Sequence, residues 1–111
     1  MSSVVIKSID RKQVEQAVND HIDHLRAHHL EIQKIIWFGS WINGIPGPGS
    51  DVDLCLILCE SEKPFRERIP DYLPSSFPVG VDVFPYTVSE LEKIQLMHPG
   101  WYREMISGKE M

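Results

Sequence analysis

Two short apolar segments, separated by a loop rich in proline and glycine, restrict the folds open to this chain of 111 residues. Ile32 to Phe38 is rich in β-branched and aromatic residues and stops at Gly39, which is typical of a buried strand. Residues 45–50 read IPGPGS and cannot continue a regular element. Val52 to Leu58 then resumes with nearly continuous apolar character. The pattern predicts two strands of one sheet on either side of a loop.

The segments outside these strands predict helices. A capping-box sequence begins a helix over about residues 10–29, in which apolar residues recur at helical spacing. A shorter helix is expected within residues 63–73, where Pro64 starts it and Pro70 breaks it. A last helix is expected over residues 89–98.

A third strand is expected over Val79 to Phe84, where apolar and polar residues alternate before Pro85. The order helix, strand, strand, helix, strand, helix predicts an α/β or α+β fold, with a small mixed β-sheet and helices packed on it. A chain of this length has room for one hydrophobic core, so residues 1–111 are expected to form a single domain.

Composition and charge exclude several classes of protein. With 42% hydrophobic and 24% charged residues, the chain can bury enough apolar surface to fold. Its longest apolar run, Leu54 to Cys59, is far shorter than the roughly 20 residues of a membrane-spanning helix. The net charge of −5, without a run of Lys or Arg, argues against non-specific nucleic-acid binding. Two cysteines and the absence of a signal-like start favour a cytoplasmic protein.

Two carboxylates, Asp51 and Asp53, occupy alternate positions at the start of the second strand. Side chains at i and i+2 of a strand point to the same face, so these two should converge. A hard divalent cation would relieve their repulsion, and Mg²⁺ often takes one or two carboxylates and completes its shell with water and phosphate oxygens. Asp82 completes a triad if the third strand lies beside the second in matching register. The simpler alternatives are that Asp51 is only a turn residue after Gly49 and Ser50, and that Asp82 is an exposed residue on an edge strand.

Gly39 and Ser40 offer the other half of a phosphate site. Gly39 lets the backbone turn without a Cβ and lets an oxyanion approach its N–H, and Ser40 adds a hydroxyl at an expected helix start. Neutral donors on one side and metal on the other suit in-line attack of a hydroxyl on the α-phosphorus of a triphosphate. This arrangement does not require a basic patch.

Other polar and aromatic residues have simpler interpretations. Trp41 is more easily explained as a packing or loop-anchoring residue than as a surface on which a base stacks. Four histidines lie at helical spacing in the first expected helix, but nothing nearby supplies a further metal ligand. We therefore expect a solvated helix face, formed by His21, His24, His28 and His29.

The stretch GSWINGIPGPGSDVDLCLIL resembles the GS-x(9–10)-DxD motif of the DNA polymerase β-like nucleotidyltransferases, and the short length resembles the minimal nucleotidyltransferases. The resemblance covers residues 32–84, about half of the chain, with its pieces in the right order. The chain departs from the family pattern at Trp41, where many members have a basic or small residue, and at Pro46 and Pro48 in the loop.

The resemblance implies the DNA polymerase β-like nucleotidyltransferase fold and transfer of a nucleoside monophosphate, AMP from ATP, to a hydroxyl, with release of pyrophosphate. It implies that three carboxylates hold two Mg²⁺ ions: Asp51, Asp53 and Asp82. Of these, Asp82 would bind the metal beside the attacking hydroxyl and help remove its proton. It also implies nucleotide contacts from Gly39 and Ser40, which would hold the β- and γ-phosphates, and from Ser50.

The acceptor is expected to come from another chain, because this one leaves little surface for gripping a base and an acceptor as well. Minimal nucleotidyltransferases are often paired with a small all-helical protein, and some act as antitoxins that transfer AMP to a tyrosine of that partner. A homodimer is the other arrangement, and a small-molecule acceptor would require it to complete the pocket. The alternative function is a catalytically silent nucleotide-binding or regulatory subunit.

Overall fold

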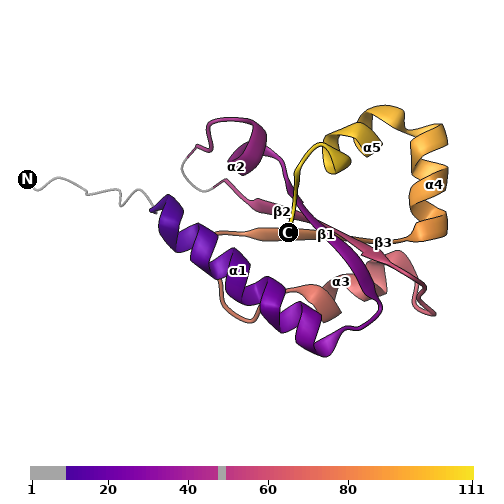
Figure 1. Cartoon of the computed structure of the whole chain (residues 1–111), viewed down its shortest axis with the longest axis horizontal. Coiled ribbons are helices and arrows are strands. Elements are labelled where there is room, and N and C mark those ends of the chain that lie inside the picture. The colour runs from indigo at the N-terminus through magenta and orange to yellow at the C-terminus, as the bar shows by residue number, and fades with distance from the viewer. Residues whose placement is uncertain (1–9, 48–49) are drawn as a thin grey trace, which may run out of the picture.

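A four-stranded mixed sheet with helices on both faces organises the protein, as seen in a computed structural model that describes residues 10–47 and 50–111 (Figure 1). In chain order the elements are α1 (Arg11–His28), β1 (Ile32–Phe38), α2 (Ser40–Asn43), β2 (Val52–Leu58), α3 (Phe65–Tyr72), β3 (Val81–Thr87), α4 (Val88–Met97), α5 (Pro99–Ile106) and β4 (Lys109–Glu110). The strand order is β3-β2-β1-β4. Strand β1 is antiparallel to β2 and β4, whereas β2 and β3 are parallel. The expected α+β fold with a small mixed sheet is confirmed.

Helix α1 follows closely from its sequence. The Asp10 carboxylate accepts a hydrogen bond of 3.1 Å from the backbone N–H of Lys12, which satisfies one of the free donors at the helix start. Apolar side chains at helical spacing then turn toward the sheet and are fully or nearly fully buried: Val14, Val18, Ile22 and Leu25. The helix was expected over about 10–29, and its bounds agree to within one residue at each end.

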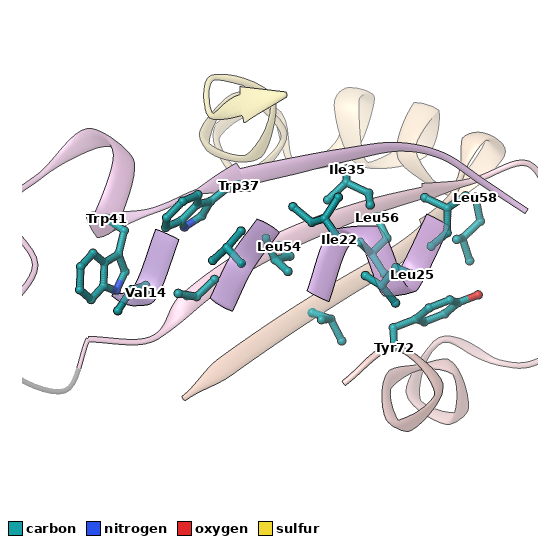
Figure 2. Packing of buried hydrophobic residues seen from close by; sticks show 14 residues of the cluster. Val14, Ile22, Leu25, Ile35, Trp37, Trp41, Leu54, Leu56, Leu58 and Tyr72 are labelled. Atoms are coloured by element: carbon teal, nitrogen blue, oxygen red, sulfur yellow. The ribbon is translucent and has the colours of Figure 1, made fainter. Parts of the chain in front are cut away.

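Helices α1 and α3 cover one face of the sheet, where the larger apolar cluster lies, and α4 and α5 cover the other (Figures 1 and 2). Strand β2 is central, so it sends alternate residues into both clusters. Val52, Leu54, Leu56 and Leu58 face α1, and Cys55 and Ile57 face α4 and α5. Burial on both faces explains the nearly continuous apolar sequence of this strand.

Two prolines were expected to end elements, and the structure shows that neither does. Pro70 lies inside α3, which continues to Tyr72. The helix ends two residues later, and Tyr72 is held in the core, so a single missing N–H is tolerated. Pro85 lies inside β3, which begins two residues later than expected and runs to Thr87. Strand β3 is at the edge of the sheet, where a residue without a backbone donor is accommodated.

The buried Arg68 of α3 ties the two faces together around the edge strand β3. Its guanidinium donates two hydrogen bonds to the Glu90 carboxylate of α4, at 2.6 and 3.1 Å, and one of 3.0 Å to the Pro85 carbonyl oxygen. Glu90 also completes a capping box with Thr87 at the start of α4. The Arg68 hydrogen bonds, ahead of those from Thr87, lower the pKa of Glu90 to about 2, against a smaller opposing effect of burial.

The C-terminal segment, for which the sequence gives no clear pattern, forms α5 and β4. Strand β4 pairs with β1, and the Met111 N–H donates to the Ile35 carbonyl oxygen at 2.9 Å.

No helix within the described residues has both the length and the apolar character to cross a membrane.

Candidate active site

Three aspartates identified in the sequence lie at the end of the sheet where β1 stops and β2 and β3 begin. Strands β2 and β3 run in parallel with Asp53 directly paired with Asp82, and Asp51 precedes the pair of Val52 with Val81. The two paired aspartates share the sheet face of α4 and α5, because side chains alternate along a strand. The matching register on which the triad depends is therefore present.

Two glycines make room for these carboxylates. Gly39 has a φ of +88°, and a Cβ at this position would lie 3.3 Å from Cγ of Asp53 and closer still to its Oδ2. A Cβ at Gly80 would lie 2.9 Å from Cγ of Asp51. Any other residue at either position would displace a carboxylate. Gly39 was expected to admit a phosphate, whereas the role of Gly80 was not predicted, because only the fold brings it beside Asp51.

The turn after β1 is built from Gly39 and the short helix α2. The Gly39 carbonyl oxygen accepts hydrogen bonds from the N–H groups of Ile42, at 3.0 Å, and Asn43, at 2.9 Å. Ser40 begins the helix, as expected, and is exposed. Because β1 is antiparallel to β2 and Phe38 pairs with Asp53, this turn lies at the same end of the sheet as the aspartates.

Charge repulsion is built into this arrangement. Burial raises the pKa of Asp53 to about 6, with further contributions from the charges of Asp82, Asp51 and Glu104. Burial also raises the pKa of Asp82, together with the charge of Asp51 and a hydrogen bond to it. Carboxylates in this state are stabilised by a proton or by a cation.

Residues 18–106 match the family model of the nucleotidyltransferase domain. The chain belongs to the nucleotidyltransferase domain family. Comparisons with curated proteins and with solved structures give no significant match. The family membership makes the protein a nucleotidyltransferase enzyme, a class that acts on nucleoside triphosphates and generally uses divalent metal ions.

The three aspartates of this nucleotidyltransferase are suitable ligands for a divalent ion, because hard divalent cations prefer carboxylate oxygens. Within residues 10–47 and 50–111, no group of three or more His, Cys, Asp or Glu side chains is placed so that it could hold a metal ion. An ion that keeps one or two carboxylates and takes its other ligands from water and phosphate does not need a group of three.

Glu104 of α5 is a fourth carboxylate near the site of this nucleotidyltransferase, since its charge contributes to the raised pKa of Asp53. It was not identified from the sequence. The only available signal was its acidic side chain in a segment whose structure could not be predicted, and the packing of α5 on the sheet brings it close.

Trp41 anchors the loop that leads to the aspartates, which confirms its expected structural role. Its ring is buried, and its indole N–H donates to the Ser50 carbonyl oxygen at 3.0 Å. The Arg11 guanidinium lies 5.3 Å from the centre of the Trp41 ring and donates to the Trp41 carbonyl oxygen at 3.1 Å. Ser50, a predicted nucleotide contact, thus presents its carbonyl to Trp41. Pro48, one of the departures from the family pattern, lies outside the described residues.

The histidine-rich face of α1 is only partly solvated, so the expectation was wrong for His21. That ring is buried, with Nε2 2.8 Å from the Tyr72 carbonyl oxygen. Burial lowers the pKa of His21. His24 and His28 are exposed, with ring centres 4.2 Å apart.

Proposed function

We propose that this nucleotidyltransferase, acting as a single domain of residues 1–111, transfers AMP from Mg²⁺-bound ATP to a hydroxyl group in the cytoplasm. The pairing of Asp53 with Asp82 in register, with Asp51 two residues earlier and Gly39 alongside, carries the proposal. This arrangement brings the carboxylates and the turn after β1 to one end of one sheet. In the reaction, the acceptor oxygen bonds to the α-phosphorus, and the bond to the leaving pyrophosphate breaks.

The three aspartates divide the work between binding and proton transfer. Asp51 and Asp53 would hold the Mg²⁺ that accompanies the triphosphate, and Asp82 would help to hold a second ion. Bound Mg²⁺ neutralises charge on the phosphates and on the leaving pyrophosphate. The raised pKa of Asp82 suits a carboxylate that accepts the proton of the attacking hydroxyl.

Neutral groups of the turn after β1 would hold the phosphates. The backbone N–H of Gly39 and the exposed Ser40 hydroxyl are donors for the β- and γ-phosphates, and Ser50 is a further nucleotide contact at the end of the loop. Support comes from the positive φ and the missing Cβ of Gly39, which let the turn lie against the Asp53 carboxylate. ATP as donor rests on the resemblance to minimal nucleotidyltransferases.

The openness of the site supports a macromolecular acceptor. Asp51 and Asp82 are exposed. We propose that the acceptor is a tyrosine hydroxyl of a small all-helical partner protein, with a homodimer as the other arrangement that would complete the site.

Transfer of label from α-labelled ATP tests the proposal. The protein is incubated with Mg²⁺ and labelled ATP, alone and with small all-helical proteins encoded by neighbouring genes as candidate partners, and label is followed on each polypeptide. We expect label on the partner, transferred far more slowly by Asp82→Asn. Binding of ATP with Mg²⁺ but no transfer to any polypeptide would instead identify a silent nucleotide-binding subunit.

A further inference from the structure

Asp51 lies just outside β2 and is exposed, yet both peptide planes that flank it are held by hydrogen bonds. The plane that enters Asp51 contains the Ser50 carbonyl, which accepts from the Trp41 indole N–H at 3.0 Å. The plane that leaves it contains the Val52 N–H, which donates to the Gly80 carbonyl oxygen at 2.9 Å. Because each peptide group is planar, fixing these two planes restricts the backbone dihedral angles of Asp51.

Trp41 is itself held in place from two directions. Its ring packs in the apolar cluster between α1 and the sheet, near Val14 at one end of that cluster (Figure 2). The Arg11 guanidinium covers the ring and binds the Trp41 carbonyl oxygen. Arg11 is the first residue of α1, so this contact joins the start of α1 to the turn after β1.

We propose that Trp41 is the positioning residue for Asp51 and that Arg11 secures Trp41, an inference that rests on the proposed role of Asp51 in holding metal and nucleotide. The hydrogen bond from Trp41 fixes the direction from which the Asp51 side chain leaves the backbone. The space that Gly80 leaves then receives the carboxylate. Without Trp41, the end of the loop would have to be ordered when the ligand binds, and that entropic cost would weaken binding.

Trp37 provides a matched control for a substitution at Trp41. Both rings are buried in the same apolar cluster (Figure 2). Among the described residues, the Trp37 indole nitrogen has no hydrogen-bond partner. Trp41→Phe and Trp37→Phe therefore remove similar apolar surface, but only the first removes a hydrogen bond.

The test compares the two variants without and with ligand. In the metal-free protein, NMR should show a changed Asp51 amide signal and faster hydrogen exchange at the Val52 amide for Trp41→Phe, with both unchanged for Trp37→Phe. In a Mg²⁺ titration at fixed ATP concentration, Trp41→Phe should need about fivefold more Mg²⁺, as expected for one lost hydrogen bond. Arg11→Gln, an exposed substitution that leaves the core intact, should shift the same signals in the same direction by a smaller amount.

Equal changes in Trp41→Phe and Trp37→Phe would overturn the inference, as would an unchanged Asp51 amide signal in both Trp41→Phe and Arg11→Gln. A wild-type protein that neither binds Mg²⁺ with ATP nor transfers AMP would show that the proposed function is wrong. The metal-free signals would then decide by themselves whether Trp41 holds Asp51.

Discussion

The two faces of the sheet differ at the end where β1 stops and β2 and β3 begin. On the face of α1 and α3, apolar packing continues through Val52 to the buried Trp41. On the face of α4 and α5, the apolar side chains of β2 and β3 end at Cys55 and Phe84. The next side chains along these two strands are Asp53, which lies beside the buried Phe38 of β1, and Asp82. The alternation of a strand thus lets one set of residues hold the fold while its neighbours, one residue away, repel each other at an open site.

The comparison predicts that substitutions on the two faces have different consequences. Residues that join or fill the apolar layers should affect the free energy of unfolding. Residues at the acidic end should affect ligand binding and turnover, and removal of a charge there should leave the fold intact or stabilise it.

Arg68→Met should have the largest effect on stability, because it breaks the connection between the faces. The substitution leaves Glu90 and the Pro85 carbonyl oxygen without their main partner. Because only the Arg68 side of this ion pair is fully buried, its loss should cost about 2 kcal/mol, between the values for surface and buried pairs. The measurement is chemical unfolding. Lys63→Met is the control, since Lys63 pairs with Asp71 on the surface and its loss should leave stability nearly unchanged.

Chemical unfolding repeated at acid pH gives an independent check of the Arg68–Glu90 pair. Arg68 holds the pKa of Glu90 at about 2, below its ordinary value of 4.5, so the pair stabilises the fold above pH 4.5. That contribution is lost as the pH falls from 4.5 through 2. If the free energy of unfolding changes by the same amount over this pH range in the wild-type protein and in Arg68→Met, the pair contributes nothing to stability.

Asp82→Asn should have the largest effect on catalysis. If Asp82 accepts the acceptor's proton, its loss lowers the transfer rate by a factor on the order of 10² or more and leaves Mg²⁺-ATP binding nearly intact. Asp51→Asn and Asp53→Asn should reduce binding and turnover together, because both residues would hold the metal that carries the triphosphate. Calorimetry measures the binding of Mg²⁺-ATP. The transfer of labelled AMP to the partner measures the rate. If Asp82→Asn transfers AMP at the wild-type rate, Asp82 has no catalytic role and is only an exposed residue on an edge strand.

Asp53→Asn should stabilise the metal-free protein at neutral pH. The pKa of Asp53 rises from 3.8 to about 6 on folding, so the folded state binds a proton more tightly than the unfolded state does. Its contribution to stability is fully present below pH 3.8 and is lost as the pH rises through 6. With allowance for solvent screening, the Asn variant should be more stable at pH 8 by about 1 kcal/mol.

Unfolding with a chelator present, at pH 4 and pH 8, measures this difference. The advantage of Asp53→Asn should shrink toward pH 4, where the wild-type carboxyl is protonated when folded. Glu90 and His21, whose pKa values are lowered on folding, are present in both proteins and cancel in the comparison. A difference that is the same at both pH values would contradict the assigned pKa of Asp53.

The sequence was sufficient to predict the elements with strong local patterns. The helical spacing of apolar residues after Asp10 and the apolar runs from Ile32 and Val52 predicted α1, β1 and β2 with nearly correct bounds. The prolines misled the prediction, because their effect depends on tertiary position. Pro85 is tolerated only because β3 is an edge strand, and a local pattern does not show which strand lies at the edge.

For the site, spacing along one strand was enough to group Asp51 with Asp53, but residues from other elements required the fold. Asp82 depended on a register that the sequence could only suppose. The sequence around Gly80 and Glu104 does not indicate that either residue belongs to the site. Gly80 belongs to it because it leaves space for the Asp51 carboxylate, and Glu104 because the packing of α5 brings its charge near Asp53. Trp41 was expected to anchor the loop, but its acceptor, the Ser50 carbonyl, became evident only from the structure.

Ser40→Ala should have the smallest effect and should separate binding from folding at the acidic end. Ser40 is exposed at the start of α2, so loss of its hydroxyl should leave the unfolding transition unchanged. If the hydroxyl donates to the triphosphate, ATP binding with Mg²⁺ weakens by about 1 kcal/mol, the value of one neutral hydrogen bond. Gly39→Val is the contrasting variant, since a side chain there collides with Asp53 and requires a strained φ, so it should abolish binding. Unchanged affinity and turnover in Ser40→Ala would limit Ser40 to a structural role in the turn and leave the phosphates to the backbone of Gly39.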